Sequence, residues 1–249
     1  MGRAPALVAI FLALGLYDTF ADRLPAIGEW GTVAFFAFAL IPLTFFTAWL
    51  ALPLREEVEP AHLLGLGLGL AGTTIVLHLA SFDAAANQTK FAAVVLLGWW
   101  FLVFFEHVGL VLLVALLIVP VDIFSVARGP TKHIVEEQPQ VFDALSIAFP
   151  VPGEQASANL GLPDVLFFAL FLGAAVRFAL RPRLTWALMT LSIGATLALT
   201  VWLREGGLPA LPLLSAGFVL ANADLLWRQV ASGRPPLLRG ERDDAPPGT

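Results

Sequence analysis

The chain alternates between long apolar stretches and short polar connections. A helix that crosses a bilayer needs about 20 predominantly apolar residues, with a range of about 17 to 25. Eight stretches reach or approach this length, at residues 5–21, 31–54, 61–81, 90–105, 108–127, 162–180, 184–203 and 208–227. The pattern therefore predicts an all-α polytopic membrane protein with about eight transmembrane helices.

Two of these helices come from one apolar run, residues 90–127, which is too long for a single span. The polar pair Glu106 and His107 interrupts the run, so we expect a tight hairpin of two helices there. The first apolar stretch resembles a signal peptide, with one Arg ahead of an apolar core. It lacks a small-x-small cleavage pattern, and we interpret it as an uncleaved first span.

One long connection, residues 128–161, separates the fifth and sixth apolar stretches. Its polar first half predicts a short surface helix from His133 to Gln138. In its second half, apolar residues alternate with small ones, which predicts a short β-strand over residues 143–151. They are Leu145, Ile147, Phe149 and Val151. The prolines at 150 and 152 restrict such a strand to an edge or a terminus.

The domain organisation follows from these elements. Residues 1–230 are expected to form a single transmembrane bundle, with N-terminal helices in 1–107 and a core in 108–227 that carries the long loop. The tail 231–249 is rich in Pro, Arg and Asp, which predicts disorder.

Composition supports a membrane location. The chain is 58% hydrophobic and 13% charged, with a mean hydropathy of +0.83, whereas about 25% of the residues in soluble domains are charged. The lipid bilayer is therefore the expected environment. The sequence has no basic patch of the kind that would indicate a nucleic acid partner. With no cysteine and four histidines, we expect no metal and no cofactor. The sequence GLGLAG (67–72) lies within an apolar span, so it indicates close helix packing rather than a dinucleotide site.

Carboxylates inside the apolar segments are the candidate chemistry. A charged Asp at mid-bilayer costs about 2.5–3.5 kcal/mol on insertion scales, so such residues are rare and usually functional. Asp18 and Asp224 lie near helix ends, where exposure at the interface is the expected state. Asp122 and Asp164 flank the long loop and can face one cleft. Two adjacent carboxylates share a proton and can activate a water molecule, which is the chemistry of aspartic proteases.

Three motifs in order resemble those of the presenilin-type (GxGD) intramembrane aspartyl proteases, over about residues 95 to 227. VDIFSVARGPTKHIVEE is similar to the stretch that begins with a Tyr-Asp motif. GLPDVLFFALFLGAA resembles the GxGD segment, and LPALPLLSAGFVLANADLL resembles the helix with a PAL motif. The resemblance implies that Asp122 and Asp164 are the catalytic pair.

The same resemblance implies further site residues. Pro209, Ala210 and Leu211 would shape the substrate side of the cleft, and Gly161 and Leu162 would precede the second catalytic Asp. The substrates would be transmembrane proteins, and the location would be the inner membrane of a prokaryotic cell. Two positions depart from the family pattern, because Val121 replaces the expected Tyr and Pro163 replaces the second Gly.

Alternatives stay open at this point. One is an inactive relative or a transporter whose Asp pair relays protons, and another is a prepilin-peptidase-like aspartic enzyme. Within the protease hypothesis, helix dipoles predict that Asp164, in a first turn, is ionised and that Asp122, near a helix end, is protonated. The strand at 143–151, centred on Ile147, is expected to pair with an unwound substrate.

Overall fold

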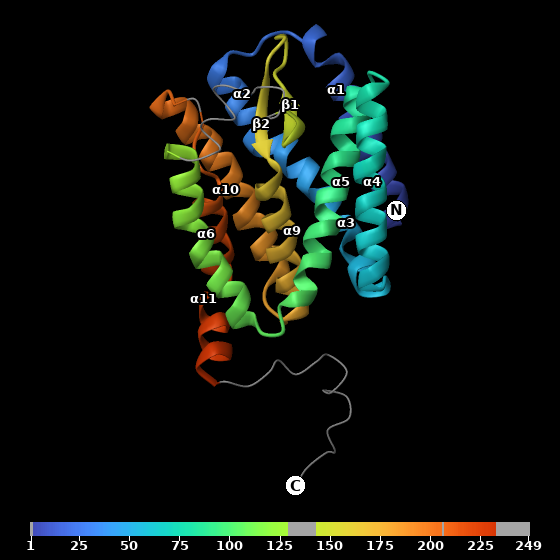
Figure 1. The fold of residues 1–249 in the computed structure, drawn as a ribbon. Coiled ribbons are helices and arrows are strands. Elements are labelled where there is room, and N and C mark those ends of the chain that lie inside the picture. Colours follow the sequence, from blue (N-terminus) through green and yellow to red (C-terminus); the bar gives the residue numbers. More distant parts are fainter. Residues whose placement is uncertain (1, 129–142, 206, 233–249) are drawn as a thin grey trace.

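The computed structural model describes residues 2–128, 143–205 and 207–232, which form a helical bundle with a two-stranded sheet at one end (Figure 1). The described residues contain eight continuous helical stretches. Six of them are long and apolar enough to cross a membrane, which indicates a membrane protein. The coarse prediction of an all-α bundle with a small β element is therefore confirmed.

The first four helical stretches form the N-terminal half. Helix α1 (Arg3–Phe20) ends in a 3₁₀ turn (Ala21–Arg23). Helix α2 (Glu29–Phe35) continues through a π-helical turn, η2 (Phe36–Leu40), into α3 (Ile41–Glu57). Helix α4 (Pro60–Leu79) lies beside α5 (Asp83–Phe101), which ends in a 3₁₀ turn, η3 (Leu102–Phe104).

The C-terminal half begins with α6 (Val108–Arg128). Strands β1 (Ser146–Pro150) and β2 (Ser157–Gly161) form an antiparallel hairpin. Strand β2 leads directly into α9 (Leu162–Arg177), which is followed by α10 (Pro182–Leu203) and α11 (Leu211–Ser232). Figure 1 shows the hairpin above the start of α9, with α6 and α11 on one side and α4 and α5 on the other.

The predicted helix boundaries hold at most positions. The break at Glu106 and His107 is confirmed, because α6 begins at Val108. The largest difference is α5, which begins at Asp83 rather than near residue 90. Its first two turns are polar, and hydrophobic periodicity assigns them to a loop. The predicted surface helix at 133–138 and nearly all of the predicted disordered tail lie outside the described residues.

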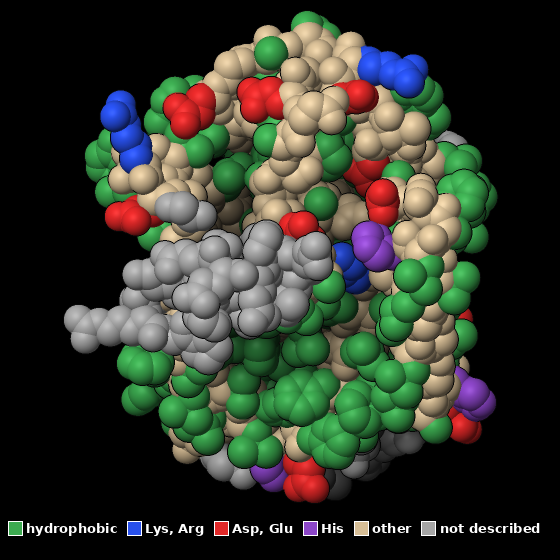
Figure 2. All heavy atoms as spheres, turned by 45° about the horizontal axis from the view of Figure 1, so that its top comes forward, with side chains coloured by type: hydrophobic (Ala, Val, Ile, Leu, Met, Phe, Trp, Pro, Cys, Tyr) green, Lys and Arg blue, Asp and Glu red, His purple; other side chains and the backbone are tan. Residues whose placement is uncertain are grey.

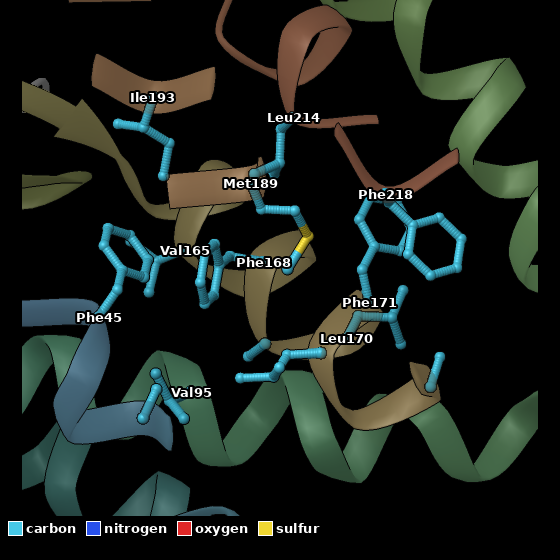
Figure 3. Packing of buried hydrophobic residues seen from close by; sticks show 14 of the residues in the cluster. Phe45, Val95, Val165, Phe168, Leu170, Phe171, Met189, Ile193, Leu214 and Phe218 are labelled. Carbon is cyan, nitrogen blue, oxygen red and sulfur yellow. The ribbon is translucent and has the colours of Figure 1, made fainter. Parts of the chain in front are cut away.

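Helix α9 is the centre of the bundle. It contacts α3, α5, α6, α10 and α11, and its residues from Phe168 to Ala175 are buried. Figure 3 shows Phe168 and Phe171 of α9 among side chains from the surrounding helices. The Phe171 ring stacks on Phe218 of α11, with 4.7 Å between ring centroids. At 16 residues α9 is short for a span, and its enclosure by protein places it at the core.

Close packing of α5 against α9 depends on Gly98. A Cβ at this position would lie 2.6 Å from the Leu166 carbonyl oxygen, so only glycine fits. Helix association in membranes relies on such contacts, since lipid tails are as apolar as the side chains. Of the glycines in GLGLAG, only Gly67 is packed in this way, because a Cβ there would lie 3.0 Å from the Leu97 side chain. Gly69 and Gly72 face open space.

Hydrophobic side chains cover the lower part of the face drawn in Figure 2, between charged side chains spread over its upper half and a few at its lower edge. Exposed apolar residues on α4 and α6 contribute to such surfaces, for example Leu68 and Leu116. A surface of this kind is stable in contact with lipid, where large exposed side chains such as these are expected rather than costly.

Candidate active site

Asp122 lies in the last two turns of α6 and is half-buried. Helix α6 packs against α11. The backbone N–H of Leu211, the first residue of α11, donates a hydrogen bond of 3.1 Å to Oδ2 of Asp122. The first N–H groups of a helix have no partner within the helix, so a carboxylate at this position satisfies one of them. The Asp122 carboxylate therefore meets the N-terminus of α11.

Asp164 is the third residue of α9 and is half-buried. Gly161 is the N-cap, and its backbone N–H hydrogen-bonds to the Asp164 carboxyl group. A Cβ at Gly161 would lie 3.1 Å from Oδ2 of Asp164. The glycine here is required for space beside the carboxyl group, since its backbone φ of −60° suits any residue.

The two aspartates belong to helices that contact each other, α6 and α9. Their carboxyl groups are near enough to repel each other when both are charged. Such a pair favours a state in which the two carboxyl groups hold one proton between them. In that state the ionised group can accept a proton from water and the protonated group can donate one. Ile118 of α6 and Val165 of α9, which lie one turn before Asp122 and next to Asp164, are both buried in the same core cluster.

The helix dipoles do not assign the shared proton as the sequence led us to expect. Asp164 does lie at the N-terminus of α9, where negative charge is favoured. Asp122, however, receives the N-terminal N–H of α11, which offsets the unfavourable end of its own helix. Each carboxyl group therefore lies at a helix N-terminus and accepts one backbone N–H, so helix dipoles alone do not distinguish the two groups.

The predicted cleft residues divide into two groups. Pro209 is half-buried, and Ala210 and Leu211 are 8% and 4% exposed, so this segment packs beside Asp122 at the start of α11. Val121 is 64% exposed and Pro163 is also exposed, whereas Leu162 is half-buried. The two residues that depart from the family pattern are thus the least enclosed of the set.

The strand predicted at 143–151 is confirmed over Ser146–Pro150 as β1, whereas residues 143–145 and 151 lie outside it, and β2 was not predicted. In the hairpin Ile147 pairs with Leu160 and Phe149 with Ala158. Hydrogen bonds at both ends of the ladder, from Leu162 to Leu145 and from Val151 to Ala156, show that the odd-numbered residues of β1 bond to β2. The even-numbered residues of β1 direct their backbone groups to the opposite edge.

That outer edge of β1 is occupied by side chains from α1 and α5. Asn87 donates a 2.8 Å hydrogen bond to the Ala148 carbonyl oxygen and accepts one of 3.0 Å from the Ala148 N–H. The Lys90 ammonium donates to the Ser146 carbonyl oxygen, and the Tyr17 hydroxyl donates to that of Pro150. These side chains occupy the backbone groups that an added strand would need, so the outer edge of β1 is not free for the predicted pairing with substrate.

Ile147 does not line a binding edge. Its side chain is 2% exposed and its backbone faces β2. The outer edge of β2 carries the backbone groups of Ser157, Asn159 and Gly161, and the first two side chains are exposed. Within the described part of the chain, no hydrogen bond from another element reaches the Ser157 or Asn159 backbone. This edge leads to Gly161 and Asp164.

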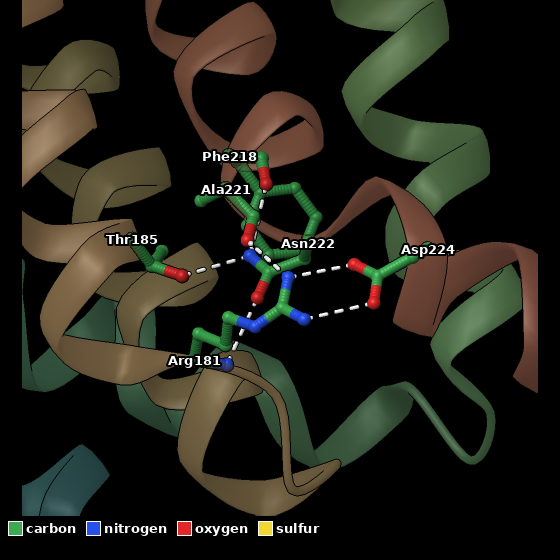
Figure 4. Close-up of polar contacts among 6 residues, drawn as sticks. All are labelled: Arg181, Thr185, Phe218, Ala221, Asn222 and Asp224. Carbon is green, nitrogen blue, oxygen red and sulfur yellow. Dashed lines mark hydrogen bonds and ion pairs between the residues drawn. The ribbon is translucent and has the colours of Figure 1, made fainter.

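Asp224 is exposed, as expected for a carboxylate near a helix end. It forms an exposed two-point ion pair with Arg181, at 2.6 and 2.8 Å (Figure 4). This contact raises the pKa of Arg181, because the hydrogen bonds stabilise its charged form. The neighbouring Asn222 is fully buried, accepts the Arg181 backbone N–H and donates to Thr185 and Phe218. The group fixes α11 against the start of α10.

The structure also identifies residues that the sequence patterns missed. Asn87, Lys90 and Tyr17 hydrogen-bond to β1. The polar start of α5 was the one feature of the sequence that could have pointed to Asn87 and Lys90. No protein-family model matches this chain, and no curated protein matches it. The functional assignment therefore rests on the arrangement of Asp122, Asp164 and the hairpin, together with the three motifs.

Proposed function

We propose that the protein is an intramembrane aspartic endopeptidase that cleaves transmembrane segments of membrane proteins. The observation that carries the proposal is the pair Asp122 and Asp164, which are half-buried on two contacting helices and whose carboxyl groups repel each other when both are charged. Under this proposal α9 and α11 also cross the bilayer, in the inner membrane of a prokaryotic cell.

The reaction follows from one shared proton. The ionised carboxylate accepts a proton from water while the water oxygen attacks the peptide carbonyl carbon. The protonated carboxyl group donates its proton to the carbonyl oxygen, which gives a neutral tetrahedral diol. The C–N bond then breaks as the nitrogen gains a proton from one carboxyl group and the other receives one from the diol. General acid–base steps of this kind contribute about 10²- to 10⁴-fold each.

The edge of β2 supports a route for substrate binding. The carbonyl groups in a substrate helix are bonded within the helix, so the segment must unwind before cleavage. An unwound segment can add to an exposed strand edge through its backbone, largely independently of its sequence. A substrate on the edge at Ser157 and Asn159 would run towards Gly161 and Asp164, which places its scissile bond near the pair.

The decisive experiment uses the purified full-length protein in lipid nanodiscs with a fluorogenic transmembrane peptide. Asp122→Asn and Asp164→Asn, made separately, should each abolish cleavage, and Asp224→Asn should leave it unchanged. Asp224 is the matched control because its carboxylate is exposed and paired with Arg181, away from the aspartate pair. Cleavage that survives either of the first two substitutions would overturn the proposal. Proton flux in liposomes without cleavage would favour the transporter instead.

A further inference from the structure

A small cavity with a mixed apolar and polar lining lies between α1, α3, α5 and β1, on other elements than those that carry the aspartate pair. Its volume is about 20 Å³, which is room for one water molecule or one monatomic ion. The polar side chains that line it come from three helices. They are Asp18 of α1, Thr44 and Thr47 of α3, and Asn87 and Gln88 of α5.

Asp18 alone carries a charge among the described residues that line this cavity. No Lys, Arg or His in the described part of the chain forms an ion pair with it. The nearest basic residues along the chain and in the adjacent helix are engaged elsewhere. Arg23 lies over the Phe20 ring, and Lys90 donates to the carbonyl oxygens of Asp143 and Ser146. Asp18 is half-buried, and a carboxylate that loses part of its water without gaining a cationic partner carries a desolvation cost.

The threonine hydroxyls cannot relieve that cost by donating to Asp18. Thr44 donates to the Leu40 carbonyl oxygen at 2.9 Å, and Thr47 donates to the Thr44 carbonyl oxygen at 2.6 Å. A hydroxyl has one hydrogen, so each Thr oxygen has only lone pairs left to offer the cavity. Both side chains are buried, at 7% and 2% exposure. The cavity therefore combines a carboxylate with acceptor oxygens, which suits a hard cation.

The local backbone is also unusual here. The π-helical turn η2 ends at Leu40, which lines the cavity, and the Ile41 N–H bonds to the Phe36 carbonyl oxygen. A π-helical turn is rare within an α-helix and is frequent at functional sites. In this chain it sets the position of Thr44, whose hydroxyl bonds to the last carbonyl of the turn.

We propose that this cavity binds one monovalent metal cation of the size of Na⁺, held by the Asp18 carboxylate with the Thr44 and Thr47 hydroxyl oxygens. The single negative charge of Asp18 balances a monovalent ion. The cation links α1 to α3 at a carboxylate that has no cationic partner among the described residues. This inference is independent of the proposed protease activity.

The site also connects to the hairpin. Asp18 hydrogen-bonds to the Asn87 side chain, and Asn87 holds both backbone groups of Ala148 in β1. Ala148 and Phe149 of β1 themselves border the cavity. Cation binding should therefore hold Asn87 in place and protect the hairpin that leads to α9.

The test measures thermal unfolding of the purified full-length protein in NaCl or in choline chloride at equal ionic strength and pH. Na⁺ should raise the Tm in a saturable way, because a ligand that binds only the folded state stabilises it. Amide hydrogen exchange over residues 146–161 should slow in the same Na⁺ range. Asp18→Asn should abolish both effects, and Asp224→Asn, which removes an exposed carboxylate, should retain them.

Thr47→Val provides a second variant of nearly unchanged shape if Asp18→Asn fails to fold. It removes one oxygen and should increase the Na⁺ concentration needed for half of the Tm shift by about tenfold, equivalent to about 1.4 kcal/mol. Equal Tm values in NaCl and choline chloride for the unmodified protein would overturn the proposal. So would a Na⁺-dependent shift that Asp18→Asn or Thr47→Val leaves intact.

Discussion

The backbone N–H of Leu211 and the carboxylate of Asp122 form a 3.1 Å hydrogen bond across 89 residues of sequence. It joins the PAL-like segment to the first aspartate of the candidate pair. The contact gives that segment a specific role, because a backbone donor at a helix N-terminus both orients the carboxylate and stabilises its charge.

Leu211→Pro removes this donor and is expected to lower kcat strongly. Proline is well suited to the first position of a helix, so α11 should still form. A hydrogen bond to a charged group contributes about 1.5–3 kcal/mol, which predicts a loss of roughly 10- to 100-fold. Leu211→Ala is the control, since it shortens the side chain and keeps the N–H. Equal cleavage rates for the two variants would show that the hydrogen bond has no catalytic role.

Gly161→Ala should reduce cleavage without unfolding the protein. The new methyl group would lie 3.1 Å from Oδ2 of Asp164, so the carboxyl group must move by a few tenths of an ångström. A small displacement of a catalytic group is costly, and we expect a loss of roughly tenfold or more. Gly207→Ala is the matched control, because a Cβ at that glycine meets no neighbour. A kinetic assay with the transmembrane peptide compares the two, and a fully active Gly161→Ala would contradict the proposed geometry.

Asn159→Pro tests whether substrate pairs with the outer edge of β2. The Asn159 N–H faces away from β1, so proline at this position leaves the hairpin ladder intact. We expect a higher KM for the peptide with little change in Tm. Ala158→Pro is the comparison, because it removes an N–H within the ladder and should lower the Tm as well. An unchanged KM for Asn159→Pro would exclude strand addition at this edge.

The rate of cleavage should depend on pH with a bell shape. At a pH below both apparent pKa values of the pair, both carboxyl groups are protonated and no base is left. At a pH above both values, both groups are ionised and no acid is left. The two apparent pKa values then belong to the pair as a whole. Measurement of kcat/KM against pH tests this, with Asp224→Asn as a variant whose profile should be superimposable. A rate that rises steadily with pH would argue against a shared proton.

Asn222→Ala should destabilise the bundle whether or not the protein is a protease. The substitution leaves the Arg181 backbone N–H and the Thr185 hydroxyl without their partner in a buried region. Each unsatisfied buried group costs about 1–3 kcal/mol, so the loss of partners for these two groups is expected to lower the free energy of unfolding by about 2–6 kcal/mol. Arg181→Ala, which removes an exposed ion pair, should have a much smaller effect. Denaturation of both variants in detergent makes the comparison.

The sequence by itself determined the helical bundle, the break at Glu106 and the strand around Ile147. These features follow from hydrophobic runs and from a period of two, which are local properties of the chain. The sequence also identified Asp122 and Asp164 as candidate site residues. A carboxylate at the edge of an apolar segment is unusual, and this can be recognised without knowing what the segment packs against.

The tertiary structure decided what those residues contact. The polar start of α5 is helical because Asn87 and Lys90 find backbone partners in β1, 61 and 56 residues away. The same contacts occupy the outer edge of β1 and leave the outer edge of β2 exposed. The proposed edge for substrate pairing is therefore on β2 rather than on β1. Asp18, interpreted from the sequence as an interfacial residue, instead lines a cavity. Each of these outcomes depends on hydrogen bonds and packing between distant segments, and local periodicity carries no information about them.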